Sequence, residues 1–288
     1  GELQVLQAGA LAHGLTPLFL PEAYEALLAP LLSGRMSFDE FVKADDSYNV
    51  YPVTDDRPFF FHIDRKFPAP YVEWLIVNAV LTALAAAAIG ASGLYRKVRG
   101  GGFGGAGAAY FALLGIGYMC VQTPAIQKSM LLLGSPTLSA AVVLLAMLLG
   151  GGAGGWLAGR IPPDSRALRA LPWVPPLTLG VLIALLLWAL PAMIALPAAL
   201  RIAAVGGLTG LAGVALGLPL PLGLRWAERE RSGASAFYFA VNGMAALWGS
   251  WLAVTVSFSG GLTSALLLGL VCYVTVAVLG RRMHLRIS

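Results

Sequence analysis

Charged residues are scarce in this sequence: they make up 11% of its 288 positions, while 58% are hydrophobic. A water-soluble domain carries about 25% charged and roughly 45–50% apolar residues. A soluble enzyme is therefore excluded as a description of the whole chain. Intrinsic disorder is excluded as well, because it requires low hydrophobicity together with high net charge.

Cysteine and intramembrane acids are nearly absent too. Cys120 and Cys272 lie inside apolar runs, so the sequence offers neither a disulfide framework nor a zinc site. Acidic side chains are missing from the interior of these runs, and Glu73 stands only at the entrance of the first. A proton-coupled transporter usually keeps an ionisable group there, and a retinal protein needs a lysine in its last span. Both classes are disfavoured, and we expect no catalytic residue, metal or cofactor in this chain.

Long apolar runs are what the sequence does contain. A bilayer span takes about 20 predominantly apolar residues. Runs of that kind predict seven transmembrane helices, near 71–94, 106–133, 137–159, 173–190, 197–218, 236–258 and 262–280. The second run is longer than a membrane requires, so we expect it to tilt or to continue past the surface. The predicted fold class is all-α integral membrane.

Residues 1–69 have a different character and precede this seven-helix domain at 70–288. They hold ten of the 14 acidic residues, and we expect a small α/β or irregular polar segment. Ser37 followed by Glu40 predicts a capping box. About 65 residues fold alone only marginally. The first residue is Gly and not Met, and no signal-peptide pattern precedes it, so we expect the chain to be the C-terminal portion of a longer protein.

The basic residues predict the orientation. They follow the first, third and fifth spans and the last one, whereas the alternate connections carry no charge. They are Arg96, Lys97, Arg99, Arg160, Arg166, Arg169, Arg225, Arg229, Arg231, Arg281, Arg282 and Arg286. The positive-inside rule places these loops and the C-terminus in the cytoplasm and residues 1–69 outside it. Because the bases lie beside apolar spans, we expect membrane lipids as partners and no nucleic acid.

A few polar side chains in the apolar region are candidate functional residues. They are Gln122, Gln127, Lys128, Ser135, Thr137 and Asn242. The glutamines can link helices by hydrogen bonds or contact a substrate. Lys128 either extends to the lipid headgroups or binds an anionic group or a partner. Asn242 is expected to form a hydrogen bond across a close helix contact.

Small residues recur four apart on three spans, as in Gly150/Gly154, Gly213/Gly217 and Ala245/Gly249. Such faces let helix backbones approach closely, so we expect either intramolecular packing or an oligomer face. The stretch 218–223 contains two prolines. It is either a plain helix end or unwound backbone that lines a cavity.

Several stretches together resemble bacterial spermidine synthase-like (polyamine aminopropyltransferase-like) membrane proteins. The resemblance is carried by Val-Thr-Asp-Asp-Arg-Pro-Phe-Phe-Phe at 53–61, by the glycine- and glutamine-containing hairpin at 115–137, by Pro-Leu-Gly at 221–223, and by Ala-Val-Asn-Gly at 240–243. In that family a glutamate usually stands in place of Gln122, and a histidine in place of Ser135.

The resemblance implies that the membrane helices accompany a Rossmann-like domain, which would bind a decarboxylated S-adenosylmethionine-type nucleotide. The core of such a domain is absent from these 288 residues, and residues 1–69 would be its remnant. The junction residues Asp55, Asp56 and Arg57 are expected to form a polar docking turn at the membrane surface. The alternative is that Asp55 and Asp56 bind a substrate such as a polyamine cation.

The leading hypothesis is a non-catalytic membrane-embedded module, acting as an anchor or as an accessory subunit of a larger complex in the bacterial inner membrane. Its partners would be other subunits or copies of itself. One alternative is a carrier or channel for a small solute such as a polyamine. Another is part of an aminopropyltransferase whose catalytic domain is missing here.

Overall fold

The computed structural model describes residues 30–31, 33–44, 53–58, 69–91, 104–162, 165 and 167–287. This described part is almost entirely helical and contains no β-strand, only a single bridge between Thr54 and Arg57. Seven of its helices are long and apolar enough to cross a membrane. The predicted fold class, an all-α seven-helix membrane protein, is confirmed.

The chain divides into two compact units, and each is described by itself. The first comprises residues 1–52 and 60–68, and the second, called the helical unit below, comprises 53–59 and 69–288. The turn at 53–58 therefore belongs with the helices that follow it.

The first unit contains helix α3 (Phe38–Ala44). The predicted capping box at its start is confirmed. The Ser37 N–H donates to Glu40 Oε2 over 2.8 Å, and the Glu40 N–H donates to Ser37 Oγ over 3.3 Å. These bonds satisfy N–H groups that a helix start leaves unpaired. The α/β or irregular structure expected for most of residues 1–69 falls outside the described residues.

The helical unit follows the apolar runs of the sequence closely. Its helices are α4 (Ala69–Ala91), α6 (Gly104–Leu133), α7 (Pro136–Arg160), α8 (Ala167–Ala170), the 3-10 helix η1 (Leu171–Trp173), α9 (Val174–Ile194), α10 (Ala198–Gly217), α11 (Pro219–Glu230), α12 (Ala234–Gly260) and α13 (Leu262–Ile287). With 30 residues, α6 is about 45 Å long at 1.5 Å per residue. It exceeds the roughly 30 Å hydrocarbon core, as predicted for this span.

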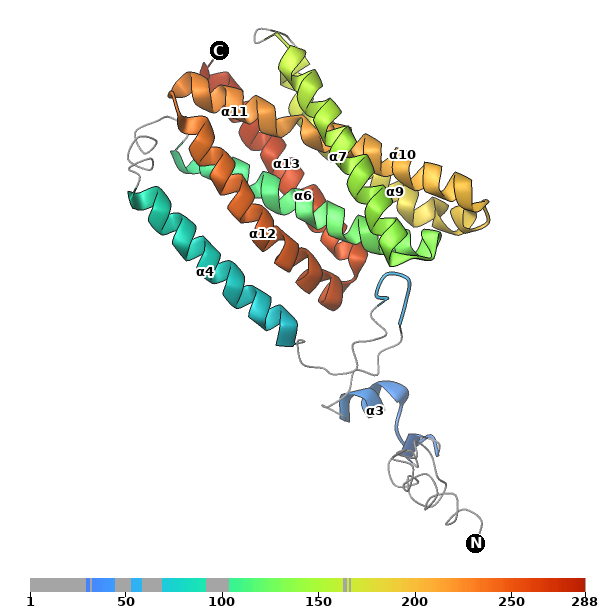
Figure 1. Cartoon of the computed structure of the whole chain (residues 1–288). Helices are drawn as coiled ribbons and strands as arrows, with labels where there is room; N and C mark the ends of the chain where they lie inside the picture. Colours follow the sequence, from blue (N-terminus) through green and yellow to red (C-terminus); the bar gives the residue numbers. More distant parts are fainter. Residues whose placement is uncertain are drawn as a thin grey trace. The chain divides into compact units, whose positions relative to one another are not determined.

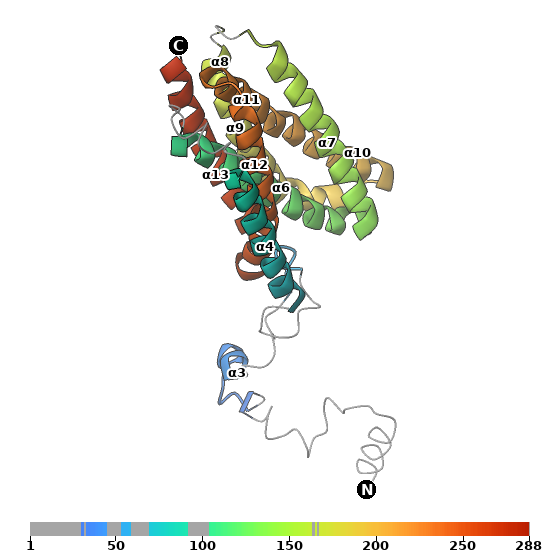
Figure 2. The same ribbon diagram turned by 60° about the vertical axis from the view of Figure 1, so that its left-hand side comes forward.

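Helix α6 lies at the centre of the helical unit (Figure 1). It packs most extensively against α12 and α13 and also contacts α7, which in turn packs along α10. Helix α4 lies alongside α12, at the left margin of the helices in Figure 1 and in front of them in Figure 2, and Asn78 is the one buried residue along it. Its apolar surface is otherwise directed outward, as expected of a helix surrounded by lipid.

Glycine brings α7 and α10 into backbone contact. A Cβ atom at Gly150 would collide with the carbonyl oxygen of Gly210, and one at Gly154 with that of Val214. Because the contacts occur in the same order along both helices, α7 and α10 run parallel. The small residues on these spans therefore serve packing within one chain, which was one of the two predictions for them.

A second close contact joins α6 and α12. Gly115 lies against the α12 backbone, and Gly249 lies against Ile116. At this contact Asn242 Nδ2 donates to the carbonyl oxygen of Phe111 over 3.1 Å. The predicted hydrogen bond of Asn242 across a close helix contact is confirmed.

The two prolines after α10 do not unwind the chain. Only Leu218 separates α10 from α11, and its backbone keeps helical angles, with φ −67° and ψ −45°. Pro219 is the first residue of α11, where the missing N–H would have no helical partner in any case. The unwound stretch considered for 218–223 is therefore wrong, and the prolines start a new helix. The Tyr110 hydroxyl donates to the Pro219 carbonyl oxygen over 2.8 Å, which secures this junction to α6.

Candidate functional site

The candidate site is built around the turn at 53–58, which lies at one end of the helical unit near the loop between α12 and α13 (Figure 1). The Arg57 N–H donates to the Thr54 carbonyl oxygen over 2.9 Å and closes the turn. Asp55 is exposed, whereas Asp56 and Arg57 each contact a helix end. Through these contacts the motif forms a polar turn docked on helix ends, which was one of the two alternatives predicted for it.

Asp56 caps the start of α13. The Leu262 N–H donates to the backbone oxygen of Asp56 over 2.8 Å, and the Thr263 N–H donates to Oδ1 over 3.0 Å. A carboxylate is favourable at this position because a helix N-terminus has unpaired N–H groups and a partial positive charge. Gly261 makes the approach possible, since its φ is +89° and a Cβ atom there would overlap the Asp56 side chain.

Lys128 on α6 supplies the second partner of Asp56. Its Nζ lies 2.7 Å from Asp56 Oδ1, and only 6% of the residue is exposed. The expectation that Lys128 extends to the lipid headgroups is wrong, because the side chain is buried and ends on a carboxylate. Burial alone would raise the pKa of Asp56, but the hydrogen bonds from Lys128 and Thr263 outweigh it and hold that pKa below its usual value.

Arg57 contacts the opposite helix end. Its Nη2 donates to the Phe258 carbonyl oxygen over 2.9 Å, close to the C-terminus of α12. A cation is favourable there because the last carbonyl groups of a helix carry a partial negative charge. We call Asp56, Arg57, Lys128, Thr263 and the Phe258 carbonyl the junction clamp. It matches the charges of Asp56 and Arg57 to helix ends of opposite sign.

The remaining candidates do not join the clamp. Gln122 Nε2 lies 3.4 Å from the Tyr118 hydroxyl, one turn earlier on the same helix. Gln127 has a buried Oε1 without a hydrogen-bond partner. Ser135 caps α7, where its Oγ accepts from the Leu138 N–H over 3.4 Å. Thr137 is exposed in the first turn of α7. These side chains therefore do not converge on a common site.

Two arginines were not predicted as structural residues. Arg201 Nη1 donates to the Leu132 carbonyl oxygen over 2.6 Å at the end of α6. Arg225 donates to Ala158 over 2.7 Å and to Ile161 over 3.1 Å at the end of α7. The signal in the sequence was an arginine inside or directly after an apolar span, where an unpaired charge would be costly. Such a residue needs an acceptor on a neighbouring helix, and the final carbonyl groups provide one.

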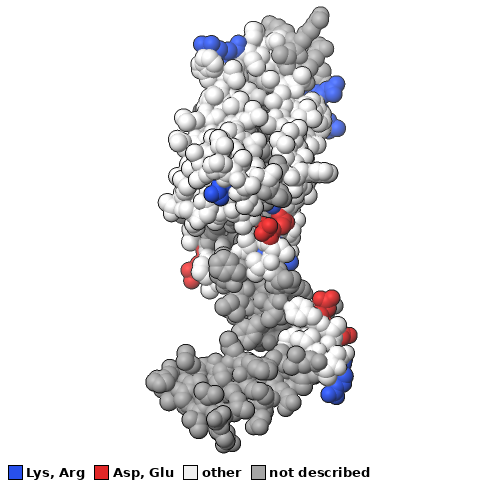
Figure 3. All heavy atoms as spheres, turned by 90° about the vertical axis from the view of Figure 1, so that its right-hand side faces the viewer, with Lys and Arg blue, Asp and Glu red and all other residues white. Residues whose placement is uncertain are grey.

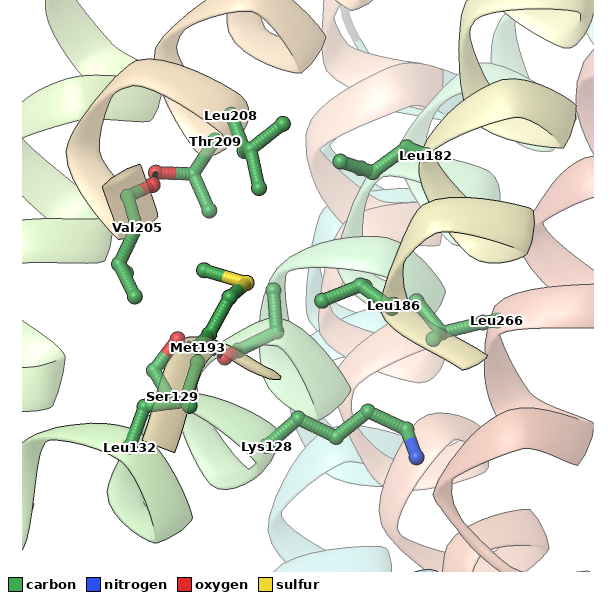
Figure 4. A pocket seen from close by; sticks show the side chains of 11 residues that line it. Lys128, Ser129, Leu132, Leu182, Leu186, Met193, Val205, Leu208, Thr209 and Leu266 are labelled. Carbon is green, nitrogen blue, oxygen red and sulfur yellow. Dashed lines mark hydrogen bonds between the residues drawn. The ribbon is translucent and has the colours of Figure 1, made fainter. Parts of the chain in front are cut away.

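A small cavity of about 20 Å³ lies beside Lys128 and is lined mostly by apolar side chains. Figure 4 shows the Lys128 amino group directed away from the space between Val205, Met193 and Thr209, so only its aliphatic stem faces the cavity. This volume holds about one water molecule at most. The cavity is therefore a packing defect beside the clamp and not a substrate site.

A metal site needs several ligating side chains close together. Among the described residues, no three His, Cys, Asp or Glu side chains lie together in this way. Cys120 and Cys272 are both buried and unpaired by a disulfide.

The fold and the clamp define an all-α, multi-pass membrane protein whose entry turn is fastened to two of its own helix ends. No known protein family, curated protein or solved structure matches this chain.

Proposed function

We propose that this chain is the non-catalytic membrane module of a spermidine synthase-like membrane protein, acting as an anchor or as an accessory subunit of a larger complex. The junction clamp carries the proposal. It fixes the point at which the polar segment enters the membrane domain, with contacts from three helices on a six-residue turn. A module that holds a polar domain at the membrane needs such a rigid entry point.

The other contacts also favour a fixed scaffold over a moving one. Lys128 is a buried cation of the apolar region, and its charge is paired with Asp56. The contacts of Gly150 and Gly154 leave no room between α7 and α10. A transporter requires helices that change their packing, and backbone contacts of this kind resist such movement.

The proposal includes an orientation in the bacterial inner membrane. Arg160, Arg225 and Arg229 lie at the ends of the parallel helices α7 and α10–α11, opposite the clamp. Figure 3 shows basic side chains toward the upper end of one face and almost no charge across its middle. With the basic end in the cytoplasm, the C-terminus is cytoplasmic and the clamp faces the other side.

The test is to purify the whole chain in mild detergent and to measure the mass of the particle by light scattering and native mass spectrometry. We expect a homo-oligomer or a complex with another subunit at fixed stoichiometry. A solitary monomer would count against the accessory role.

The anchoring role has its own variant. Asp56→Asn combined with Arg57→Gln should make the turn at 53–58 more accessible to protease in membrane vesicles, while Asp55→Asn should leave the cleavage rate unchanged. Equal cleavage of both variants would contradict the proposed anchoring.

The alternative functions remain predictions with distinct tests. A carrier should support uptake of a polyamine by proteoliposomes, and that uptake should fall in Gln127→Leu and Asn242→Leu. An aminopropyltransferase should convert putrescine when a decarboxylated S-adenosylmethionine donor is added. Gln122 and Gln127 do not line the cavity beside Lys128, and the Asn242 side chain donates to the Phe111 carbonyl oxygen, so these contacts favour the anchor over the carrier.

A further inference from the structure

A second, larger cavity lies between α6, α7, α12 and the α10–α11 junction, with a volume of about 360 Å³. Sites for small molecules are typically about 300–1,000 Å³. Its walls are mostly apolar, and no charged side chain lines it. The polar side chains on its surface are Tyr118, Asn242 and Tyr273.

Glycine and proline create this space. Gly155 of α7 has no side chain, and its nearest neighbour across the cavity is Pro221, which a Cβ atom would meet at 3.5 Å. One helical turn earlier, Gly152 is exposed, has no neighbour within 4 Å and does not line the cavity. The two glycines therefore offer a matched pair for testing the cavity.

Two arginines lie just beyond one end of the cavity. Arg160 follows Gly155 by five residues on α7, and Arg225 follows Pro221 by four residues on α11. At 1.5 Å per residue, both are within about 8 Å of the cavity along the helix axes. The Arg160 guanidinium lies 3.7 Å from the centroid of the exposed Trp156 ring. Arginine and tryptophan together are typical of the depth of lipid headgroups.

The charge around this end is positive on balance. Arg229, Arg231, Arg281 and Arg282 lie at the same end of the helical unit, together with Glu228 and Glu230. Glu228 accepts hydrogen bonds from Gly233 and Ser235 in its own loop. The net positive charge complements an anionic group at the mouth of an apolar cavity.

We infer that this cavity binds an acyl chain of an anionic phospholipid, with the phosphate group against Arg160. Arg225, whose Nη1 and Nη2 donate to the Ala158 and Ile161 carbonyl oxygens, adds its positive charge nearby. A polyamine does not fit, because no carboxylate lines the cavity to balance its charge. A partner helix does not fit either, because a helix is about 10 Å across and would need a far larger groove. An acyl chain matches the apolar walls, and a phosphate matches the arginines. This inference goes beyond the proposed anchoring function.

The test uses the whole chain purified in mild detergent from membranes that contain both phosphatidylglycerol and phosphatidylethanolamine. Native mass spectrometry should detect one retained phosphatidylglycerol. Gly155→Leu fills the cavity and should reduce its occupancy by about tenfold, equivalent to 1.4 kcal/mol. Gly152→Leu adds the same side chain outside the cavity and should leave the occupancy unchanged.

A second variant separates the headgroup from the chain. Arg160→Gln should weaken retention of phosphatidylglycerol relative to phosphatidylethanolamine, whereas Arg35→Gln, an exposed residue of the first unit, should not. Thermal melts of each variant show whether it is folded, and Ala246→Leu replaces Gly155→Leu if the latter is unfolded.

Three results would overturn the inference: equal lipid retention by Gly155→Leu and Gly152→Leu, no preference for the anionic lipid, or a polypeptide or polyamine bound in place of lipid. The first two do not bear on the particle mass or on protease protection, by which the anchoring function is judged, and a bound polypeptide would overturn the lipid inference while supporting the accessory role.

Discussion

Asp56 combines two roles that are usually separate. Its backbone and carboxylate oxygens cap α13, and the same carboxylate neutralises Lys128 within α6. An asparagine could accept the capping bonds but would leave the lysine charge unbalanced. A buried cation without a partner is costly in an apolar surrounding. The identity of this side chain is therefore determined by charge as much as by hydrogen bonding.

Removing the charge of Asp56 should destabilise the helical unit. We expect Asp56→Asn to lower the free energy of unfolding by about 1–3 kcal/mol, because Lys128 then loses its counter-charge. Lys128→Met in the same chain should recover part of this loss, since no unpaired charge remains. Denaturation in detergent measures the free energy of unfolding of Asp56→Asn, of Lys128→Met and of the double variant. The exposed neighbour Asp55→Asn should change stability by less than about 0.5 kcal/mol, and strict additivity of the two changes would contradict the coupling.

The clamp should also weaken in acid. The folded-state pKa of Asp56 is lowered, so the group stabilises the fold above the usual aspartate value of about 3.9. That contribution is lost as the pH falls through the lower, folded-state value. Thermal melts from neutral pH down to about pH 3 should show a steeper loss of melting temperature for the native chain than for Asp56→Asn. Parallel curves for the two proteins would show that Asp56 does not titrate as an ion pair.

At the level of the elements, small residues decide which helices touch. The α7–α10 and α6–α12 pairs meet through glycine, so backbone lies on backbone with no side chain between. In lipid, helix association depends on such packing because there is no hydrophobic force between helices. At the helix ends, Arg201 and Arg225 donate to carbonyl oxygens of α6 and α7, and Arg57 of the junction clamp donates to a carbonyl oxygen of α12.

A methyl group at Gly154 should separate α7 from α10. Gly154→Ala places a Cβ atom against the Val214 backbone, which we expect to cost about 1–3 kcal/mol. Gly152→Ala on the same helix meets open space and should be neutral or slightly stabilising, because alanine favours the helix by up to about 1 kcal/mol. Unfolding in detergent compares the two. Equal stability would show that α7 and α10 do not pack through Gly154.

At the scale of the whole chain, the seven spans place the ends of alternate helices on opposite membrane faces. Cysteines introduced one at a time at Lys97, Arg229, Thr137 and Ser259, with Cys120 and Cys272 replaced by alanine, should report this by thiol labelling in intact cells. We expect the cysteines that replace Lys97 and Arg229 to be labelled only after permeabilisation. The cysteines that replace Thr137 and Ser259 should be labelled without it. Labelling of Lys97 and Arg229 from opposite sides would contradict the seven-span topology.

The number of spans could be read from the sequence because it depends on local composition. Each span is about 20 contiguous apolar residues, and their transfer into lipid is decided without reference to the other helices. The positions of most helix bounds, the capping box at Ser37 and the close contact at Asn242 follow from such local patterns. The prolines at 219 and 221 were ambiguous, since proline both ends one helix and begins the next.

Only the tertiary structure decided which polar groups meet. Asp56 and Lys128 are 72 residues apart, and Asp56 and Thr263 are 207 apart. Whether these side chains converge depends on the rotation and register of each packed helix, which no local pattern encodes. The sequence therefore left Lys128 open between the lipid headgroups and an anionic group or a partner, and the packing of α6 beside α13 made it the buried partner of the Asp56 carboxylate.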